Sequence, residues 1–299
     1  MPNSNGINRG SAGRGGVGTG IGAFGTGGGK HSGRTGARSL TVRLNALESN
    51  EVIAGKNKAL FGKAFVMNFL SSPGSGKTSL LESVVPLLKS EGLNIAVIEG
   101  DVETDLDKRR IDALNVPAYQ IITNGTCHLD ANMVHTSLNN LNIKDTDVIF
   151  IENVGNLVCP TSYNLGEDMK AVVLSVTEGD DKPLKYPAAF YKSKVMIINK
   201  IDLLPALDSD VSKIKENALS INKELIIFET SCKSKRKING GGSLVCGGGS
   251  VSGTDNTGGG SDGRDKGISD FVSFIKEKAR LKADEFNDEF KDNGGGMYL

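Results

Sequence analysis

The sequence of 299 residues carries 35 basic and 35 acidic side chains, four cysteines and no tryptophan. This even charge balance argues against a body that binds nucleic acid. No apolar run approaches the roughly 18–20 residues that a bilayer-spanning helix needs, which argues against a membrane protein. Four cysteines in a long chain without a secretory signal favour a reducing compartment, and we predict the cytoplasm.

Glycine is concentrated in three segments of the chain. Of the 39 glycines, 14 lie in residues 1–38, 12 in 240–267 and three in 294–296. Such segments bury too little apolar surface to offset the conformational entropy of the chain. We therefore predict one folded domain made of residues 39–232 plus 267–282, a low-complexity insert at 233–266, and a disordered head (1–38) and tail (283–299).

Two basic segments raise the question of targeting. Residues 1–38 hold five basic side chains and no acidic ones, as a transit peptide does. Their glycine content disfavours the amphipathic helix that such a peptide needs. The run KSKRK (233–237) is a candidate nuclear signal, although short basic runs are more often solvated surface.

Short apolar runs alternate with helix-like stretches along the folded part. The runs are nearly continuous in apolar character, as expected for strands covered on both faces. Strands that alternate with helices imply right-handed crossovers, so we predict an α/β fold with a mostly parallel sheet of about seven strands and helices on both faces. Ligands are then expected at the carboxyl ends of the strands. The expected strands are 64–70, 94–98, 118–122, 147–151, 171–176, 194–198 and 224–228, and the expected helices include 77–90, 129–141, 208–222 and 268–282.

The loop after the first expected strand, SSPGSGKTS (71–79), has the features of a phosphate-binding loop. The Walker pattern fails only at its first position, where Ser71 replaces glycine. Gly74 and Gly76 permit the positive φ angles that let backbone N–H groups converge on phosphate oxygens. An ordinary Gly-rich turn is the alternative, but the strand before the loop and the helix after it favour a P-loop NTPase. The predicted nucleotide-binding residues are Gly74, Ser75, Gly76, Lys77, Thr78 and Ser79, with Lys77 on the β and γ oxygens and Thr78 on Mg²⁺.

Residues Asn199-Lys200-Ile201-Asp202 follow the sixth expected strand and match the guanine-reading motif of GTPases. The Asp202 carboxylate would accept hydrogen bonds from guanine N1–H and the N2 amino group, which adenine lacks. Lys200 would lie against the base, and Asn199 would brace the loop. The tetrapeptide is weak evidence alone, but its place behind a P-loop and a parallel strand makes it strong. Ser231 follows the last expected strand, where a further base contact is expected.

Two carboxylates stand at the ends of expected strands, Asp101 at the second and Glu152 at the fourth. P-loop enzymes place magnesium ligands and water-positioning groups at such strand tips. Solvated strand ends are the alternative, but Glu152 begins a Glu-x-x-Gly sequence that resembles the γ-phosphate-sensing loop of one subgroup of GTPases. We predict Lys77, Asp101 and Glu152 as catalytic residues, and Thr78 and Asp101 as ligands of Mg²⁺.

Cys127 and His128 lie in TNGTCHLDA after the third expected strand, and Cys159 lies in GNLVCP beyond the fourth. Thiolate and imidazole ligands suit Zn²⁺, Ni²⁺ or Cu rather than Mg²⁺. The spacing matches no compact zinc motif, so a buried cysteine and a helix-capping histidine are the ordinary alternative. All three residues nevertheless follow strands on the nucleotide side of the sheet. Three ligands leave a site incomplete, and water or a second subunit would complete it.

Together these motifs resemble the HypB family of hydrogenase nickel-incorporation GTPases, in the SIMIBI class of P-loop proteins. The resemblance runs from about Ser39 to Cys232 and resumes at Gly267, through SSPGSGKTSLLE, AVIEGD, TCHLDA, FIENVGNLVCP, LSVTEGDDKPLKYP and NKIDLLP. It implies a slow GTPase that forms a homodimer when GTP-bound and couples hydrolysis to nickel delivery, using GTP, Mg²⁺ and Ni²⁺ or Zn²⁺. Its implied partners are a nickel-handling chaperone and the hydrogenase large subunit, and its implied metal ligands are Cys127, His128 and Cys159.

The sequence departs from that resemblance in residues 1–38 and in the insert. The head contains one histidine and no cysteine, so it lacks the nickel-storing tract that many members of the family carry. Two other functions remain open. One is a sibling GTPase that delivers nickel to urease or another metalloenzyme, although TCHLDA and NLVCP favour the hydrogenase branch. The other is a nucleotide-switched regulator with little turnover, whereas Asn-Lys-x-Asp argues against a nucleoside kinase.

Overall fold

The computed structural model describes residues 33–101, 106–233 and 263–292. The chain divides into two units, one that ends at Arg43 and one that begins at Leu44. The first unit contributes the beginning of helix α1 (Gly33–Phe61), and the second holds the rest of α1 and the other described elements. The predictions of disorder for residues 1–32, 234–262 and 293–299 concern segments outside the described residues.

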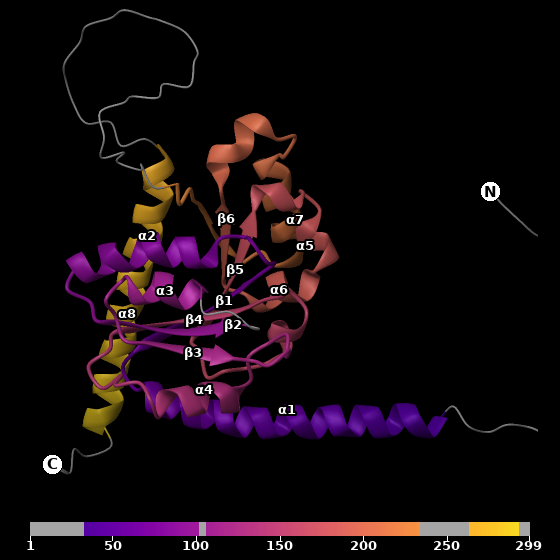
Figure 1. Ribbon diagram of the computed structural model, residues 1–299, viewed down its shortest axis with the longest axis vertical. Coiled ribbons are helices and arrows are strands. Elements are labelled where there is room, and N and C mark those ends of the chain that lie inside the picture. The colour runs from indigo at the N-terminus through magenta and orange to yellow at the C-terminus, as the bar shows by residue number, and fades with distance from the viewer. Residues whose placement is uncertain (1–32, 102–105, 234–262, 293–299) are drawn as a thin grey trace, which may run out of the picture. The chain divides into compact units, whose positions relative to one another are not determined.

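A seven-stranded sheet forms the centre of the second unit (Figure 1). Its strand order is β3-β2-β4-β1-β5-β6-β7, and all of the neighbouring strands are parallel. Strand β1 lies between β4 and β5, where the strand order reverses, so a crevice opens at its carboxyl end. This confirms the predicted fold class. The strands are β1 (Phe65–Ser71), β2 (Ile95–Asp101), β3 (Ala118–Ile122), β4 (Val148–Gly155), β5 (Met169–Ser175), β6 (Val195–Asn199) and β7 (Ile226–Glu229).

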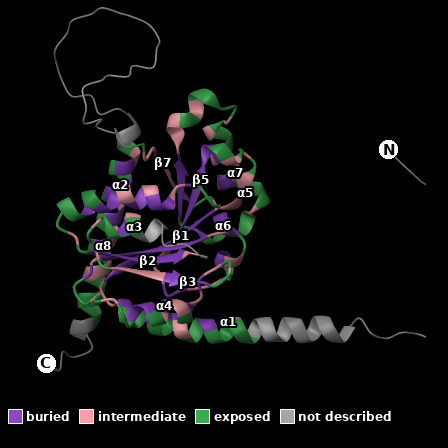
Figure 2. Cartoon of the chain, viewed as in Figure 1, coloured by how far each residue is buried: buried purple, intermediate pink, exposed green. Residues whose placement is uncertain are grey.

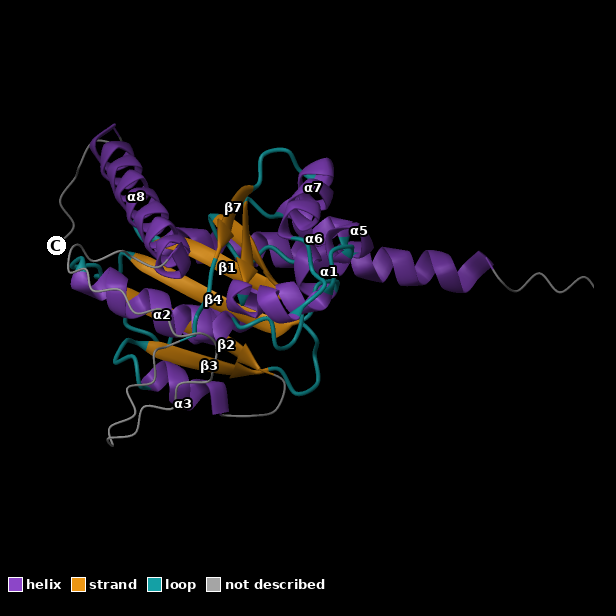
Figure 3. Cartoon of the chain, turned by 90° about the horizontal axis from the view of Figure 1, so that it is seen from above, coloured by secondary structure: helices purple, strands orange, loops and turns teal. Residues whose placement is uncertain are grey.

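Helices flank both faces of this sheet (Figure 3). Among the described residues, no helix combines the length and the apolar character that a bilayer crossing requires. Besides α1, the α-helices are α2 (Lys77–Ser90), α3 (Leu106–Asp112), α4 (Ala131–Leu138), α5 (Lys182–Lys185), α6 (Pro187–Lys192), α7 (Val211–Ile221) and α8 (Gly263–Asp292). The 3-10 helices within the described part of the chain are η1 (Cys159–Ser162), η2 (Val176–Glu178) and η3 (Ile201–Ala206).

The alternation of side chains along each strand divides the core into layers. Phe65, Met67 and Phe69 of β1 are buried on the face that α2 and α8 cover. Val66 packs with α4 on the opposite face, and Leu70 packs there with α6 and α7. Figure 2 shows the strands as mainly buried and the outward sides of the helices as exposed. Both faces of the sheet are therefore covered, which is why the strands are apolar at nearly every position.

Helix α1 is not among the helices expected from the sequence, and polar contacts explain why. Asn50 and Asn57 are buried, seven residues apart and so on one side of the helix. Asn50 Nδ2 donates to the carbonyl oxygen of Asn164 at 2.7 Å, and Asn57 Nδ2 donates to that of Ala131 at 2.8 Å. The buried stripe of α1 is made of Asn50, Ala54, Asn57 and Phe61, and its two amides interrupt the apolar period that predicts a helix.

Helix α8 also differs from its expected range of 268–282, because it continues through Asp292. Ile268, Phe271 and Ile275 are buried against the sheet and α2 and fix the first half of the helix. Once a helix is nucleated, each further residue adds a hydrogen bond at small entropic cost. Residues 283–292 therefore continue the helix, with the Phe286 ring beside Gly62, whereas the sequence predicted a disordered tail from 283.

Two helical glycines provide a test of how closely α8 approaches β7. A Cβ atom on Gly267 would overlap the backbone carbonyl of Glu229, whereas a Cβ on Gly55 of α1 would meet nothing within 4 Å. We expect Gly267→Ala to lower the free energy of unfolding by about 1–3 kcal/mol through overpacking. Gly55→Ala, the matched control, is expected to raise it by about 0.5–1 kcal/mol because alanine is the better helix former. Urea denaturation measures both values, and equal effects would contradict this packing.

Candidate functional site

The loop between β1 and α2 has the backbone of a phosphate-binding loop. Gly74 and Gly76 adopt positive φ angles of 74° and 97°, and Gly76 is the N-cap of α2. A Cβ atom on Gly76 would lie 2.6 Å from Asn199 Nδ2, so only glycine fits there without movement. The N-terminus of α2 adds free N–H groups and the positive end of the helix dipole. The loop is therefore suited to an anion such as a nucleotide phosphate.

Lys77 and Thr78 meet Glu152 directly behind this loop. Lys77 Nζ donates to Ser71 Oγ at 2.8 Å and lies 4.0 Å from Glu152 Oε1. Thr78 Oγ1 donates to the same carboxylate oxygen at 2.9 Å. All three side chains are buried, so their electrostatic interactions are only weakly screened by solvent. The structure thus brings together three residues that are predicted to act on the phosphates and on Mg²⁺.

A cleft of about 450 Å³ opens at the carboxyl ends of β1, β2 and β4. This volume falls within the range of about 300–1,000 Å³ typical of ligand sites. Asp101 lies at the end of β2 and lines the cleft, as expected. Carboxylate and hydroxyl oxygens are the ligands that Mg²⁺ prefers, and Asp101 and Thr78 both offer them to this cleft. These residues therefore fit the predicted metal.

Sequence reasoning missed two charged residues of the cleft, Glu99 and Arg110. Glu99 stands two residues before Asp101 in β2, and a period of two places both on one face of the sheet, so this signal was available. Arg110 comes from α3 and donates to Ser79 Oγ at 2.8 Å and to both oxygens of Glu82. No sequence motif marked this arginine, because α3 joins α2 only through tertiary packing.

The loops after β6 and β7 hold the predicted guanine-reading residues together. Asn199 Nδ2 donates to the carbonyl oxygen of Ser75 at 3.0 Å, which is the bracing contact expected of it. Lys200 adopts a left-handed φ of 63°, and its Nζ donates to the carbonyl of Gly74 at 2.6 Å. Ser231 Oγ donates to Asp202 Oδ1 at 2.6 Å. The Asp202 carboxylate is thereby oriented by the predicted second base loop.

Two more residues lie around this nucleotide region: Glu178, which the sequence did not indicate, and Cys232, which stands in the expected second base loop. Glu178 of η2 accepts a hydrogen bond of 2.6 Å from Ser75 Oγ, and its other oxygen lies 3.2 Å from Lys182 Nζ. Cys232 packs against the core, and burial raises the pKa of its thiol to about 11. Cys232 is therefore a protonated packing residue at neutral pH, which agrees with its separation from the predicted metal ligands. Cys246 lies outside the described residues.

Cys127, His128 and Cys159 form a cluster at the same edge of the sheet. Their ligand atoms all lie within 4.8 Å of one another, and Cys127 Sγ is 3.9 Å from His128 Nδ1. Thiolate sulfurs and imidazole nitrogens that share an ion at about 2.0–2.3 Å lie no more than about 4.6 Å apart. Small side-chain movements would therefore bring all three onto one ion.

Further contacts hold the metal cluster in place. Asn156 Nδ2 donates to the carbonyl of Cys127 at 3.2 Å, which connects the loop after β4 to the loop after β3. The ring of Tyr163 stacks on that of His128 with centroids 4.0 Å apart and planes at 24°. Burial lowers the pKa of His128, and nearby Asp130 partly opposes this effect. The imidazole is therefore neutral at neutral pH, as a metal ligand must be.

The parallel sheet, the phosphate-binding loop at the end of β1 and the guanine-type loop after β6 define a P-loop nucleotide-binding protein of the GTPase class. Residues 65–229 match the family described as "CobW/HypB/UreG, nucleotide-binding domain". The chain belongs to this family. The assignment confirms the resemblance that the sequence motifs indicated.

Individual relatives narrow the assignment to the HypB branch. The chain is 48% identical to the hydrogenase maturation factor HypB of Escherichia coli strain K12 over 199 residues, which cover 66% of this chain and 68% of that protein. It is 40% identical over 207 residues to the hydrogenase/urease maturation factor HypB of Helicobacter pylori strain J99, covering 67% and 84%. A crystal structure of HypB from Helicobacter pylori in complex with nickel superposes with a TM-score of 0.64 at 35% identity, covering 79% of this chain and 97% of the other.

Replacing Lys77 tests whether the phosphate-binding loop takes part in GTP hydrolysis. We expect Lys77→Ala to reduce the GTP hydrolysis rate at least hundredfold, because the ammonium stabilises charge on the transferring phosphoryl group. Phosphate release measures the rate, and circular dichroism monitors the fold. The control is Lys223→Ala, which removes an exposed lysine from the turn after α7. A rate within about threefold of the wild type would contradict the role of Lys77.

Replacing Asp202 tests the base specificity. Asp202→Asn places an amide opposite a donor of guanine, so GTP binding is expected to weaken by about 2–4 kcal/mol while xanthosine triphosphate binding strengthens. Titration with fluorescent nucleotides measures both affinities. Asp208→Asn, at an exposed position outside the loop, is the matched control. Unchanged GTP affinity in Asp202→Asn would remove the guanine assignment.

Proposed function

We propose that this chain is a GTP-hydrolysing metallochaperone that delivers nickel during the maturation of [NiFe]-hydrogenase. The observation that carries this proposal is the soft-ligand cluster of Cys127, His128 and Cys159 at the same edge of the sheet as the nucleotide cleft. The printed names of the relatives, which are hydrogenase maturation factors, and the nickel complex of one of them support it. A nucleotide enzyme without cargo would have no need of this second site.

The hydrolytic step follows from the residues around the cleft. Lys77 would neutralise the β and γ oxygens, and Thr78 and Asp101 would hold Mg²⁺, which supplies further charge neutralisation when bound. Glu152 lies where it can sense or polarise the group that attacks the γ-phosphate. In the structure Thr78 and Lys77 both contact this carboxylate. We therefore expect slow intrinsic turnover, since the carboxylate must first be released from these contacts.

The cargo is a soft divalent ion, and the three ligands suit Ni²⁺ and Zn²⁺ alike. One chain supplies three ligands, so a second copy or water must complete the coordination. We propose a homodimer in the GTP-bound state, with exposed Cys127 at the contact. A nickel-handling chaperone would supply the ion and the hydrogenase large subunit would receive it, in the cytoplasm.

Delivery to urease is the second candidate function. The Helicobacter pylori relative is named for both hydrogenase and urease maturation, so one site can serve two clients in this family. Both functions use the same nucleotide and metal sites. A client assay with the apo form of each enzyme distinguishes them.

Metal titration tests the proposed link between the two sites. Cys159 lies seven residues after Glu152 in the chain, so movement of this loop on GTP binding should displace one of the three ligands. We expect the Ni²⁺ affinity to differ at least about fivefold between the GDP state and the state with a non-hydrolysable GTP analogue, and by linkage Ni²⁺ must shift nucleotide affinity by the same factor. Cys159→Ala should lose most of the affinity and the difference, whereas the control Cys246→Ser should keep both. Identical affinities in all of these states would contradict the coupling.

A further inference from the structure

The end of β4 carries two polar residues that point in opposite directions. Successive side chains of a strand lie on opposite faces of the sheet. Glu152 faces α2, where Thr78 Oγ1 donates to it at 2.9 Å. Asn153 faces the other way, toward the layer that contains α4. A movement of this strand end therefore acts on both faces at once.

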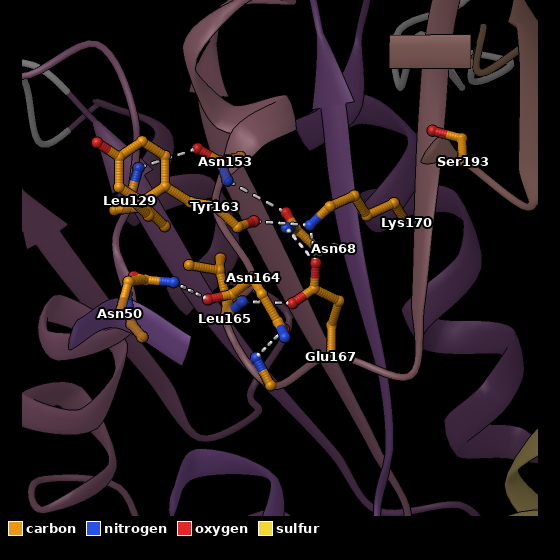
Figure 4. A network of polar contacts seen from close by, with 12 residues as sticks. Asn50, Asn68, Leu129, Asn153, Tyr163, Asn164, Leu165, Glu167, Lys170 and Ser193 are labelled. Carbon is orange, nitrogen blue, oxygen red and sulfur yellow. Dashed lines mark hydrogen bonds and ion pairs between the residues drawn. The ribbon is translucent and has the colours of Figure 1, made fainter. Parts of the chain in front are cut away.

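The side chain of Asn153 reaches the loop that carries the metal ligands (Figure 4). Its Oδ1 accepts a hydrogen bond of 3.2 Å from the backbone N–H of Leu129, the residue after His128, and another of 3.0 Å from Val154. Its Nδ2 donates to Asn68 Oδ1 at 3.2 Å. Asn153 and Asn68 are both buried, so an amide that lost these partners could not replace them with water.

From Asn68 the polar contacts continue back to the metal cluster by a second route. Asn68 Nδ2 donates to Glu167 Oε1 at 3.3 Å, and Glu167 forms an ion pair with Lys170. Lys170 Nζ also donates to the carbonyl oxygen of Tyr163 at 2.8 Å. The ring of Tyr163 is the one that stacks on His128. Figure 4 shows Asn68, Asn153, Glu167, Lys170 and Tyr163 as one connected group.

We propose that Asn153 is a positioning residue that ties the Cys127-His128 arm of the metal site to the strand that carries Glu152. This inference rests on the proposed function and adds a connection to it. The loop from Glu152 to Cys159 moves one ligand, and Asn153 moves the other two. Both arms of the cluster then respond to the nucleotide.

The geometry explains how a small displacement is transmitted. When Thr78 turns its hydroxyl oxygen to a metal ion on nucleotide binding, Glu152 loses the hydrogen bond that holds it in the present position. A shift of the end of β4 would lengthen the Asn153–Leu129 hydrogen bond of 3.2 Å and so weaken it. The position of the backbone after His128 would then change, although Leu129 stays packed in the core.

The first experiment compares Ni²⁺ affinity in the GDP state and in the GTP-analogue state for the full-length wild type and for variants. We expect a ratio of at least about fivefold in the wild type and less than half of that ratio in Asn153→Ala, where only the Cys159 arm still responds to the nucleotide. Asn153→Asp keeps an acceptor for the Leu129 amide. On a logarithmic scale, we expect it to recover at least half of the affinity ratio that Asn153→Ala loses. Asn222→Ala is the control, because Asn222 Nδ2 ties loops at the other edge of the sheet, to the carbonyls of Phe190 and Ser193. It should lower the melting temperature and leave the ratio unchanged.

A second measurement needs no variant and covers the case in which Asn153→Ala does not fold. Hydrogen exchange at the Leu129 amide of the wild type is expected to change at least about fivefold between the two nucleotide states. A wild-type ratio that survives in folded Asn153→Ala, or an exchange rate that is the same in both states, overturns this inference and leaves the metallochaperone intact. A wild type that binds no Ni²⁺ through Cys127, His128 and Cys159 overturns the proposed function itself, and the inference with it.

Discussion

The carboxylate of Glu152, held by Thr78 and Lys77, is the contact on which the functional part of this structure depends. It joins the end of β4 to the start of α2, and residues of both elements line the nucleotide cleft. The interaction is buried, so each of its members needs the others: a lone carboxylate or a lone ammonium at that depth would be strongly destabilising. A nucleotide with its metal ion offers Lys77 and Thr78 new partners of opposite charge or greater strength. Nucleotide binding would therefore exchange these contacts for contacts with the ligand.

The order of the strands allows a change at this contact to affect both faces of the sheet. Because β1 and β4 are neighbours at the centre of the sheet, a change at their ends is felt on both faces. One face holds the phosphate-binding loop, and the other holds the polar group around Asn68 and the loop of His128. Buried polar groups are costly unless they are fully hydrogen-bonded. The presence of Asn68 and Asn153 within an otherwise apolar pair of strands is therefore more easily explained by a connection between sites than by stability.

Much of this architecture could be read from the sequence, because continuous apolar runs, Gly-Lys-Thr and Asn-Lys-x-Asp are local signals. All seven strands lie within a few residues of their expected ranges, and the structure brings Cys127, His128 and Cys159 together as the positions of their loops implied. What the sequence did not disclose depends on tertiary contacts between polar groups. Helix α1 docks through Asn50 and Asn57, Glu178 reaches Ser75 across 103 positions, and Asn153 reaches Leu129 across 24. No periodicity or motif in the sequence predicts that a side-chain amide will hydrogen-bond to a backbone group in another loop.

The close approach of Gly267 to the carbonyl of Glu229 has a consequence for the segment that separates them. The chain leaves the body after β7 and re-enters it beside the same strand, so the two points of attachment are neighbours in the described structure. Closing a longer loop between fixed, adjacent ends costs only about 0.6 kcal/mol for each doubling of its length. The adjacency of Glu229 and Gly267 therefore means that the body requires no minimum span of the connection between them. The same position is a natural point at which to graft a reporter domain onto this protein.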